Sequence, residues 1–197
     1  MANIATSVFK VMGTRDAVIN LYEAMKSLQK DNNNIWLGDL TDYYGIDHKT
    51  RGISVRGNIL TFGYEEDPEV DYYLLSFETE SAWDAPFEII EAINEVLSDE
   101  LEINYRVIEC GCDLFYVHQE SAIDFFPEEC CVSAYGDPFE ESCEDVYLTV
   151  EDAIMEWCSA TGNPRGEMTT EEMMNYINAY EYDDPDTYFY IYEIEHD

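Results

Sequence analysis

The feature that most constrains this chain is its charge. Its 197 residues contain 44 Asp and Glu against nine Lys and Arg, which gives a formal charge of −35 at pH 7. A charge of this size repels itself in a compact state and opposes folding. The chain is nevertheless 46% apolar and rich in Tyr, Phe and Ile, residues that disordered acidic chains lack. We therefore expect a soluble, globular protein with an acidic surface.

The acidic excess grows along the chain. Up to Arg106 there are 20 acidic and eight basic residues, and from Val107 onward 24 acidic residues accompany Arg165 alone. Ordinary solubility requires a net charge of only about 2–8 for a small domain, so solubility does not explain the excess. Adaptation to high salt is one alternative, although the many Asn, Ile, Tyr and Cys residues argue against it. An acidic surface without a specific partner is another.

The sign of the charge restricts the partners. Nucleic acids and anionic membranes would be repelled, whereas a protein with a basic groove would be attracted in a salt-dependent way. Duplex DNA carries one charge per about 1.7 Å of axis, so the formal charge matches roughly 60 Å of duplex. The amount of charge is therefore on the scale expected of a nucleic-acid decoy.

The sequence indicates a cytoplasmic protein. Residues 1–14 lack the continuous apolar segment of a signal peptide, and nowhere do about 18 apolar residues follow one another as in a membrane-spanning helix. Without an export signal, cysteines are expected to be reduced thiols. The six cysteines all lie in the second half of the chain: Cys110, Cys112, Cys130, Cys131, Cys143 and Cys158.

The apolar periodicity of residues 1–112 predicts an α+β core. The expected strands are 4–11, 53–62, 70–79 and 102–109. One expected helix is capped by Thr14 and runs to about Lys30, and the other spans residues 84–98. This order of elements predicts a ferredoxin-like βαββαβ sandwich, with an antiparallel sheet and both helices on one face. Residues 63–68 have the composition of a hairpin loop.

Residues 113–197 are expected to form an α/β extension that packs on the core as part of one body. Short strands are predicted at 114–117, 123–126 and 146–148, and an aromatic strand at 187–194. Thr149 is the expected N-cap of one helix, and Thr169 or Thr170 that of another.

Several stretches resemble the YubB-type ferredoxin-like proteins of phages and plasmids. They are Met1-Ala2-Asn3, Gly45-Ile46-Asp47, Phe77-Glu78-Thr79, Ala82-Trp83, Pro86, Ile103-Asn104-Tyr105 and Glu109-Cys110-Gly111. The chain departs from the family where Ile4-Ala5 replace its usual Trp and Cys. The resemblance covers most of the chain and implies a mobile-element origin and a ferredoxin-like core. It implies no particular reaction.

Motifs for chemistry are absent from the sequence. The Cys110-Gly111-Cys112 and Cys130-Cys131 pairs lack the spacing of zinc or iron–sulfur sites, and buried free thiols are the favoured interpretation. His48, His118 and His196 stand in no recognisable catalytic motif. We therefore expect no metal, no cofactor and no catalysis. A carboxylate-dependent enzyme stays open as an alternative, because sugar hydrolases need only two acids.

Acidic residues at helical spacing mark the second predicted helix. Asp84, Glu88, Glu91, Glu95 and Asp99 step by four, three, four and four residues, which places about one carboxylate on each 5.4 Å turn of one face. Like charges at this spacing repel, and an ordinary solvated face mixes in Lys. No Lys follows Lys49, so we interpret the stripe as part of a functional charge array.

Other clusters extend this candidate partner-binding surface. They are Glu65, Glu66 and Asp67; Glu140, Glu141, Glu144 and Asp145; and Asp183, Asp184 and Asp186. We predict a non-catalytic inhibitor that mimics nucleic-acid charge and blocks a basic DNA- or RNA-binding protein of a bacterial host, such as a CRISPR effector or a restriction enzyme. The alternative is an acidic module that regulates a basic host protein.

Overall fold

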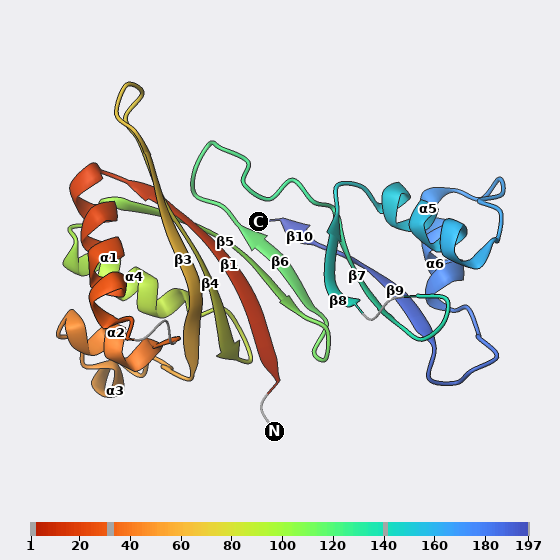
Figure 1. Cartoon of the computed structure of the whole chain (residues 1–197), viewed down its shortest axis with the longest axis horizontal. Coiled ribbons are helices and arrows are strands. Elements are labelled where there is room, and N and C mark those ends of the chain that lie inside the picture. Colours follow the sequence, from red (N-terminus) through yellow and green to blue (C-terminus); the bar gives the residue numbers. More distant parts are fainter. Residues whose placement is uncertain (1–2, 31–33, 140–141, 197) are drawn as a thin grey trace. The chain divides into compact units, whose positions relative to one another are not determined.

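The computed structural model describes residues 3–30, 34–139 and 142–196. They form an α+β protein, as the sequence predicts, and divide into two compact units (Figure 1). Unit 1 contains the described residues up to Phe125, and unit 2 contains residues 126–196. Each unit has a hydrophobic core of its own.

Unit 1 is built on an antiparallel sheet. Its strands are β1 (Ile4–Gly13), β2 (Ile35–Trp36), β3 (Gly57–Asp67), β4 (Tyr72–Ala82), β5 (Leu101–Glu109) and β6 (Leu114–His118). Hydrogen-bonded neighbours follow the order β6-β5-β1-β4-β3-β2, and each of these pairs is antiparallel. The helices are α1 (Arg15–Leu28), α2 (Leu37–Tyr43), α3 (His48–Arg51) and α4 (Phe87–Val96).

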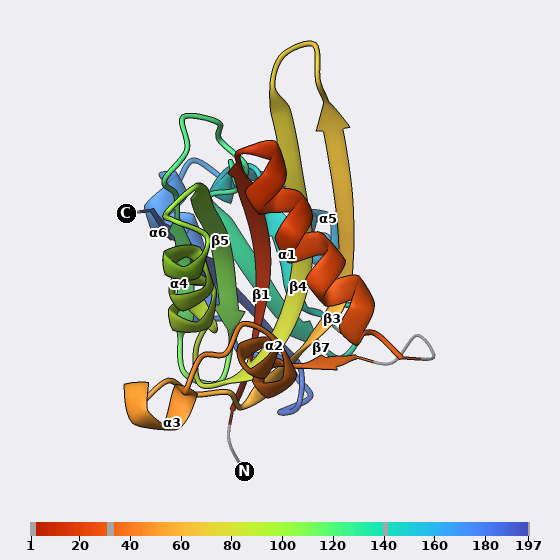
Figure 2. The ribbon, with the colours of Figure 1, turned by 90° about the vertical axis from the view of Figure 1, so that its left-hand side faces the viewer.

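One face of this sheet packs against α1 and α4 (Figure 2). β1 shows how the alternation of its residues produces this core, since Phe9 and Val11 are fully buried while Lys10 between them is not. The Phe9 ring stacks on Phe77 with centroids 4.7 Å apart and on Tyr105 at 5.1 Å. Burial of one such side chain stabilises the fold by about 1.5–3 kcal/mol.

The β3–β4 hairpin is longer than predicted. Strand pairing continues to Asp67, which lies opposite Tyr72, so the predicted loop over residues 63–68 is mostly strand. The extension is stabilised from the helical side, because Tyr64 stacks on Tyr22 with ring centroids 5.4 Å apart. The acidic composition of residues 63–68 is typical of a loop, so the sequence pattern did not indicate this part of the strand. The hairpin extends past the end of α1 (Figures 1 and 2).

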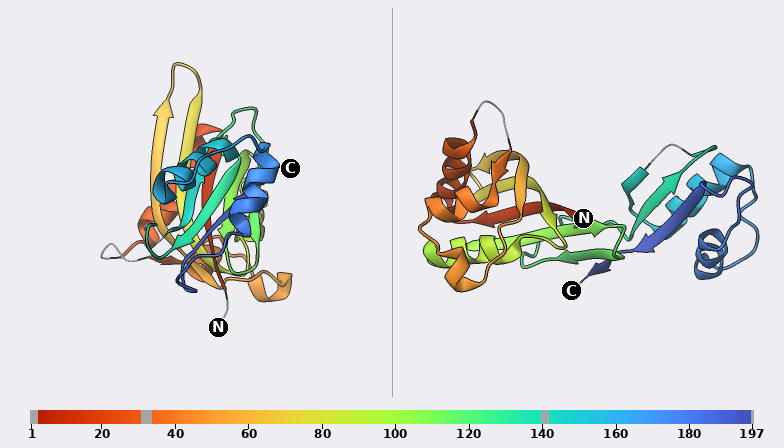
Figure 3. Two further views of the ribbon diagram at one scale, coloured as in Figure 1. Left: turned by 90° about the vertical axis from the view of Figure 1, so that its right-hand side faces the viewer. Right: turned by 90° about the horizontal axis from the view of Figure 1, so that it is seen from below.

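Unit 2 contains a second antiparallel sheet. Its strands are β7 (Cys130–Tyr135), β8 (Ser142–Tyr147) and β9 (Tyr188–Glu193), in the order β8-β7-β9, and the short β10 (Glu195–His196) follows. The helices α5 (Val150–Thr161) and α6 (Thr170–Asn178) pack on this sheet (Figure 3). The strand predicted at 123–126 is wrong, because these residues have no strand pairing.

Side-chain caps begin three of the helices where the sequence predicts them. The hydroxyl groups of Thr14 and Thr149 accept hydrogen bonds from the backbone of Ala17 and Asp152, respectively. Thr169, rather than Thr170, caps α6 in a capping box with Glu172. Each cap satisfies a backbone N–H that the helix itself leaves without a partner.

The two units divide after Phe125, further along the chain than the predicted boundary at residue 112. The reason is β6, which pairs with β5 from Tyr105↔His118 to Glu109↔Leu114 and so belongs to the sheet of unit 1. No helix in the described residues is both long enough and apolar enough to cross a bilayer.

Candidate functional site

The predicted acidic stripe is only partly helical. Three of its carboxylates lie in α4: Glu88, Glu91 and Glu95. Asp84 stands before the helix, and Asp99 follows it in the left-handed conformation with φ +58°. All five residues of the stripe are exposed, but two of them lie outside the helix.

Local side-chain hydrogen bonds flank the helix at both ends. Before it, the Ser81 hydroxyl donates to the Asp84 carbonyl, and the Asp84 carboxylate accepts from the Ala85 backbone at 2.7 Å. After it, the Asn94 side chain accepts from the Leu101 N–H at 2.9 Å and donates to the Leu101 carbonyl at 3.0 Å. The spacing of apolar residues along the sequence gives no indication of these bonds. The prediction that Asp84 and Asp99 belong to the helix is therefore wrong.

Glu95 has a cationic partner. The Arg51 guanidinium donates to both of its carboxylate oxygens, at 2.8 and 2.9 Å. A carboxylate in the last turn of a helix is unfavourable because the carbonyl end of the helix dipole is negative. Arg51 offsets this cost. Among the described residues, Glu88 and Glu91 are the exposed α4 carboxylates of the stripe that have no ion pair.

The second predicted cluster lies on the long hairpin. Glu65, Glu66 and Asp67 are the last residues of β3 and are exposed, and the turn that follows adds the exposed Glu69 and Asp71. Glu66 accepts a hydrogen bond from the Tyr64 hydroxyl at 2.8 Å and lies 3.7 Å from Arg15. The hairpin end is therefore acidic, although the three predicted residues precede its turn.

The third predicted cluster can be placed only in part. Glu140 and Glu141 lie outside the described residues, and the backbone of Glu144 belongs to β8. Asp145 in the same strand is exposed. The structure therefore places one side chain of this cluster at the surface of unit 2.

Two residues of the fourth predicted cluster line a pocket. Asp183, Asp184 and Asp186 are exposed in the segment between α6 and β9, and the Asp184 carboxylate accepts from the Asp186 N–H at 3.0 Å. Asp183 and Asp184 line a pocket of about 620 Å³ together with Asp137 and Glu181. Asp137 was not among the predicted site residues, because only the fold brings it to this segment.

The single Lys or Arg residue of unit 2, Arg165, pairs with a carboxylate of the same unit. The 71 residues of unit 2 include 19 Asp and Glu, so with Arg165 as the single base its formal charge is −18. Arg165 donates to Glu151 from Nε at 2.6 Å and from Nη2 at 2.9 Å. This pairing lowers the pKa of Glu151 and raises that of Arg165. The other carboxylates of unit 2 consequently have no Lys or Arg of their own unit to neutralise them.

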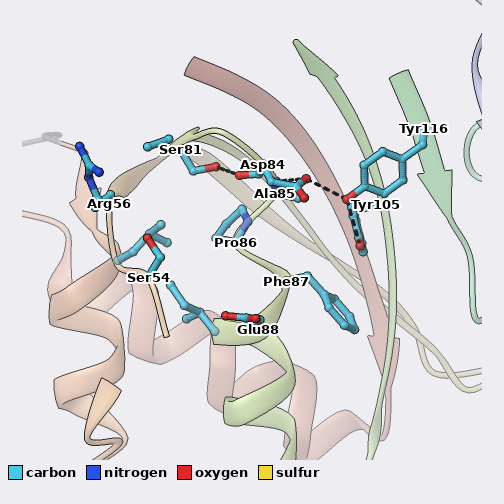
Figure 4. Close-up of a pocket in the computed structure, with 13 residues that line it drawn as sticks. Ser54, Arg56, Ser81, Asp84, Ala85, Pro86, Phe87, Glu88, Tyr105 and Tyr116 are labelled. Atoms are coloured by element: carbon cyan, nitrogen blue, oxygen red, sulfur yellow. Dashed lines mark hydrogen bonds between the residues drawn. The ribbon is translucent and has the colours of Figure 1, made fainter. Parts of the chain in front are cut away.

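Unit 1 also contains a pocket of about 340 Å³ (Figure 4). Asp84, Arg56 and Tyr116 are among the residues that line it. The Tyr116 hydroxyl donates to Asp84 at 2.9 Å and lies 3.4 Å from the Tyr105 hydroxyl. Burial, reinforced by these hydrogen bonds, raises the pKa of Tyr116 far above its usual value. Tyr116 therefore stays protonated near neutral pH, so it donates a hydrogen bond to Asp84 and cannot act as a general base.

The described thiols are mostly structural. Cys130, Cys131 and Cys158 are buried, and burial raises the pKa of Cys130 to about 12. Cys110 and Cys112 lie in the turn after β5, where Cys112 is exposed and accepts from the Asn3 amide at 2.7 Å. Within residues 3–30, 34–139 and 142–196, no group of three or more His, Cys, Asp or Glu could hold a metal ion.

The site therefore consists of dispersed exposed carboxylates, with an acidic pocket in unit 2 and a mixed polar pocket in unit 1. Comparison with known proteins adds no relative: no family model, no curated protein and no solved structure matches the chain.

Proposed function

We propose that this protein is a non-catalytic inhibitor that mimics the charge of a nucleic acid. It presents carboxylates to the basic DNA- or RNA-binding channel of another protein and excludes the nucleic acid from it. The observation that carries this proposal is the charge of unit 2, which is −18 with its one base bound to Glu151. Such a field attracts basic proteins quickly and in a salt-dependent way.

The proposed target is a defence effector of a bacterial host, either a CRISPR effector or a restriction enzyme. The support for this choice is the resemblance of the sequence to proteins of phages and plasmids, whose hosts carry such systems. The protein would act in the host cytoplasm. Because competition for a channel requires no chemistry, the proposal assigns no catalytic residue.

A ferredoxin-like class for unit 1 belongs to the same proposal. The strand order β5-β1-β4-β3, with α1 and α4 packed on one face, supports it. The strands β2 and β6 would then be additions at the two edges of the sheet.

The first test is a pulldown from bacterial lysate with the tagged full chain, eluted by a salt gradient. The proposal expects a nuclease or another nucleic-acid-binding protein that salt releases and that added duplex DNA or guide RNA displaces. If no basic protein is retained at low salt, the charge is not a recognition device and the proposal fails.

The second test removes charge in groups. Replacing Asp183, Asp184 and Asp186 together with Asn should weaken binding to the captured target clearly, whereas each single change should have little effect. Asn at 184 keeps a side-chain acceptor for the Asp186 N–H, so the turn is preserved. Neutralising Glu88 and Glu91 together is the matched experiment in unit 1. A single substitution that abolishes function while its neighbours are silent would instead indicate a carboxylate-dependent enzyme.

A further inference from the structure

The pocket of unit 1 has an aromatic wall. Its volume of about 340 Å³ is at the small end of the range of about 300–1,000 Å³ for small-molecule sites. Leu37, Ile89 and Tyr105 are buried lining residues. The Tyr105 ring stacks on Phe87 with centroids 5.4 Å apart and meets Tyr116 edge-on at 5.8 Å, and all three rings line the pocket. The pocket can therefore pack against a small apolar or aromatic group.

Arg56 is the cation of this pocket, and its charge is not neutralised. Arg15, Arg51 and Arg165 each form an ion pair with a glutamate. Arg56 forms neither an ion pair nor a side-chain hydrogen bond in the part of the chain that the structure describes, although the sequence contains 44 Asp and Glu. Because Arg56 is exposed and lines the pocket, its guanidinium group is free to bind an anionic group there.

Two exposed carboxylates, Asp84 and Glu88, line the same pocket. Oδ1 of Asp84 accepts from the Ala85 N–H at 2.7 Å and from the Tyr116 hydroxyl at 2.9 Å, which fixes the carboxylate. Its Oδ2 accepts no hydrogen bond from the described residues. Figure 4 shows Arg56 and Asp84 on different sides of the pocket. The pocket therefore offers both signs of charge to a ligand.

We infer that this pocket binds a free amino acid with an aromatic side chain. Arg56 receives the α-carboxylate, since a guanidinium group matches a carboxylate in bidentate hydrogen bonds. Asp84 and Glu88 receive the α-ammonium group, and the side chain packs on the aromatic wall. The field of this acidic chain repels anionic ligands such as nucleotides, whereas a zwitterion carries no net charge. The inference is independent of the proposed function, which does not use the pocket.

The test titrates the full chain by calorimetry with L-phenylalanine and with two analogues that each lack one charge. Phenethylamine lacks the carboxylate, and 3-phenylpropionate lacks the ammonium group. L-phenylalanine should bind about tenfold more tightly than either analogue, because each analogue loses a charge-assisted interaction. Absence of binding by L-phenylalanine at millimolar concentration overturns the inference, and so does equal affinity for L-phenylalanine and phenethylamine.

Two variants then assign the ends of the ligand. Arg56→Gln should raise the Kd of L-phenylalanine about tenfold without weakening phenethylamine, which has no carboxylate. Glu88→Gln should weaken L-phenylalanine and phenethylamine without weakening 3-phenylpropionate. Both replaced side chains are exposed, so the fold should be retained.

The matched controls are Arg15→Gln and Glu91→Gln, which make the same changes of charge at exposed residues of unit 1 outside the pocket. Neither control should alter the affinity for L-phenylalanine. If each control weakens binding as much as its pocket variant, the effect comes from net charge and the amino-acid site is refuted.

Discussion

Arg165 donates to both carboxylate oxygens of Glu151, and its Nη1 also donates to the Met168 carbonyl at 2.7 Å. One guanidinium thus connects α5 to the segment that leads into α6. Charge-assisted bidentate pairs are among the stronger hydrogen bonds in proteins. The single cation of unit 2 therefore has a structural role, and the acidic surface around it is left uncompensated.

Replacing Arg165 with Gln should lower the melting temperature of the protein, because Glu151 loses its partner and the Met168 carbonyl loses a donor. Binding to a basic target should not weaken, since the net charge becomes more negative. Thermal unfolding followed by circular dichroism measures the first effect. Lys26→Gln is the control, because the Lys26–Glu23 pair is exposed on both sides and such pairs contribute little. Equal melting temperatures for the two variants would refute the structural role of Arg165.

Glu172 should make stability depend on pH in the acid range. Its carboxylate accepts from the Thr169 backbone N–H at 2.9 Å and from the Thr169 hydroxyl at 3.1 Å, and these bonds lower its pKa. A depressed folded pKa adds stability that is present above the unfolded value of about 4.3 and is lost as the pH falls through the folded pKa.

Glu172→Gln should accordingly lower the melting temperature at pH 7 and have a smaller effect at an acid pH below the folded pKa, where the carboxylate of the parent is protonated. The neighbouring Glu171→Gln is the control and should show no such difference between the two pH values. A difference between parent and Glu172→Gln that is constant across this range would show that the charge of Glu172 does not contribute to the cap.

Tyr116→Phe should lower the free energy of unfolding by about 1 kcal/mol at pH 7, the usual contribution of one hydrogen bond. The raised pKa of Tyr116 means that the parent loses this contribution as the pH rises above the unfolded value of about 10. The variant lacks that loss, so the two proteins should become more similar at alkaline pH. Denaturant titrations at both pH values measure this. Unimpaired inhibition by the variant is also expected, because the proposed function does not use the pocket.

Salt should affect stability and binding in opposite directions. Raising NaCl from about 10 mM to 1 M shortens the Debye length from about 30 to 3 Å. Repulsion among the carboxylates is then screened and the melting temperature should rise, whereas the affinity for a basic target should fall. Thermal unfolding and calorimetry over the same salt series measure both. A melting temperature that falls with added NaCl would show that self-repulsion does not limit stability.

Local signals in the sequence predicted local structure. The caps at Thr14, Thr149 and Thr169 were found because a capping side chain and its backbone donor lie within one helical turn. β1 and β5 were found because apolar residues alternate along them. β7, in contrast, was missed: all but its last residue are buried, so it shows no alternation of apolar and polar residues.

The extents of β3 and α4 depended on side-chain contacts that reach beyond one helical turn. Stacking of Tyr64 on Tyr22 extends an acidic strand, and hydrogen bonds from Asn94 to Leu101 end a helix before its acidic pattern stops. Neither contact leaves a periodic pattern in the sequence. Tyr22 and Tyr64 are far apart along the chain, and Asn94 contacts Leu101 through a polar side chain.

The amount, sign and uneven distribution of charge follow from the sequence alone, because they are sums over residues and need no geometry. The tertiary structure decided which charges are neutralised and which come together. It bound Arg165 to Glu151, brought Asp137 to Asp183 and Asp184, and aligned Tyr135 with Tyr188 and Tyr190. These arrangements depend on strand register and on the meeting of loops. Both are set by packing between segments far apart in the sequence, so neighbouring residues along the chain could not reveal them.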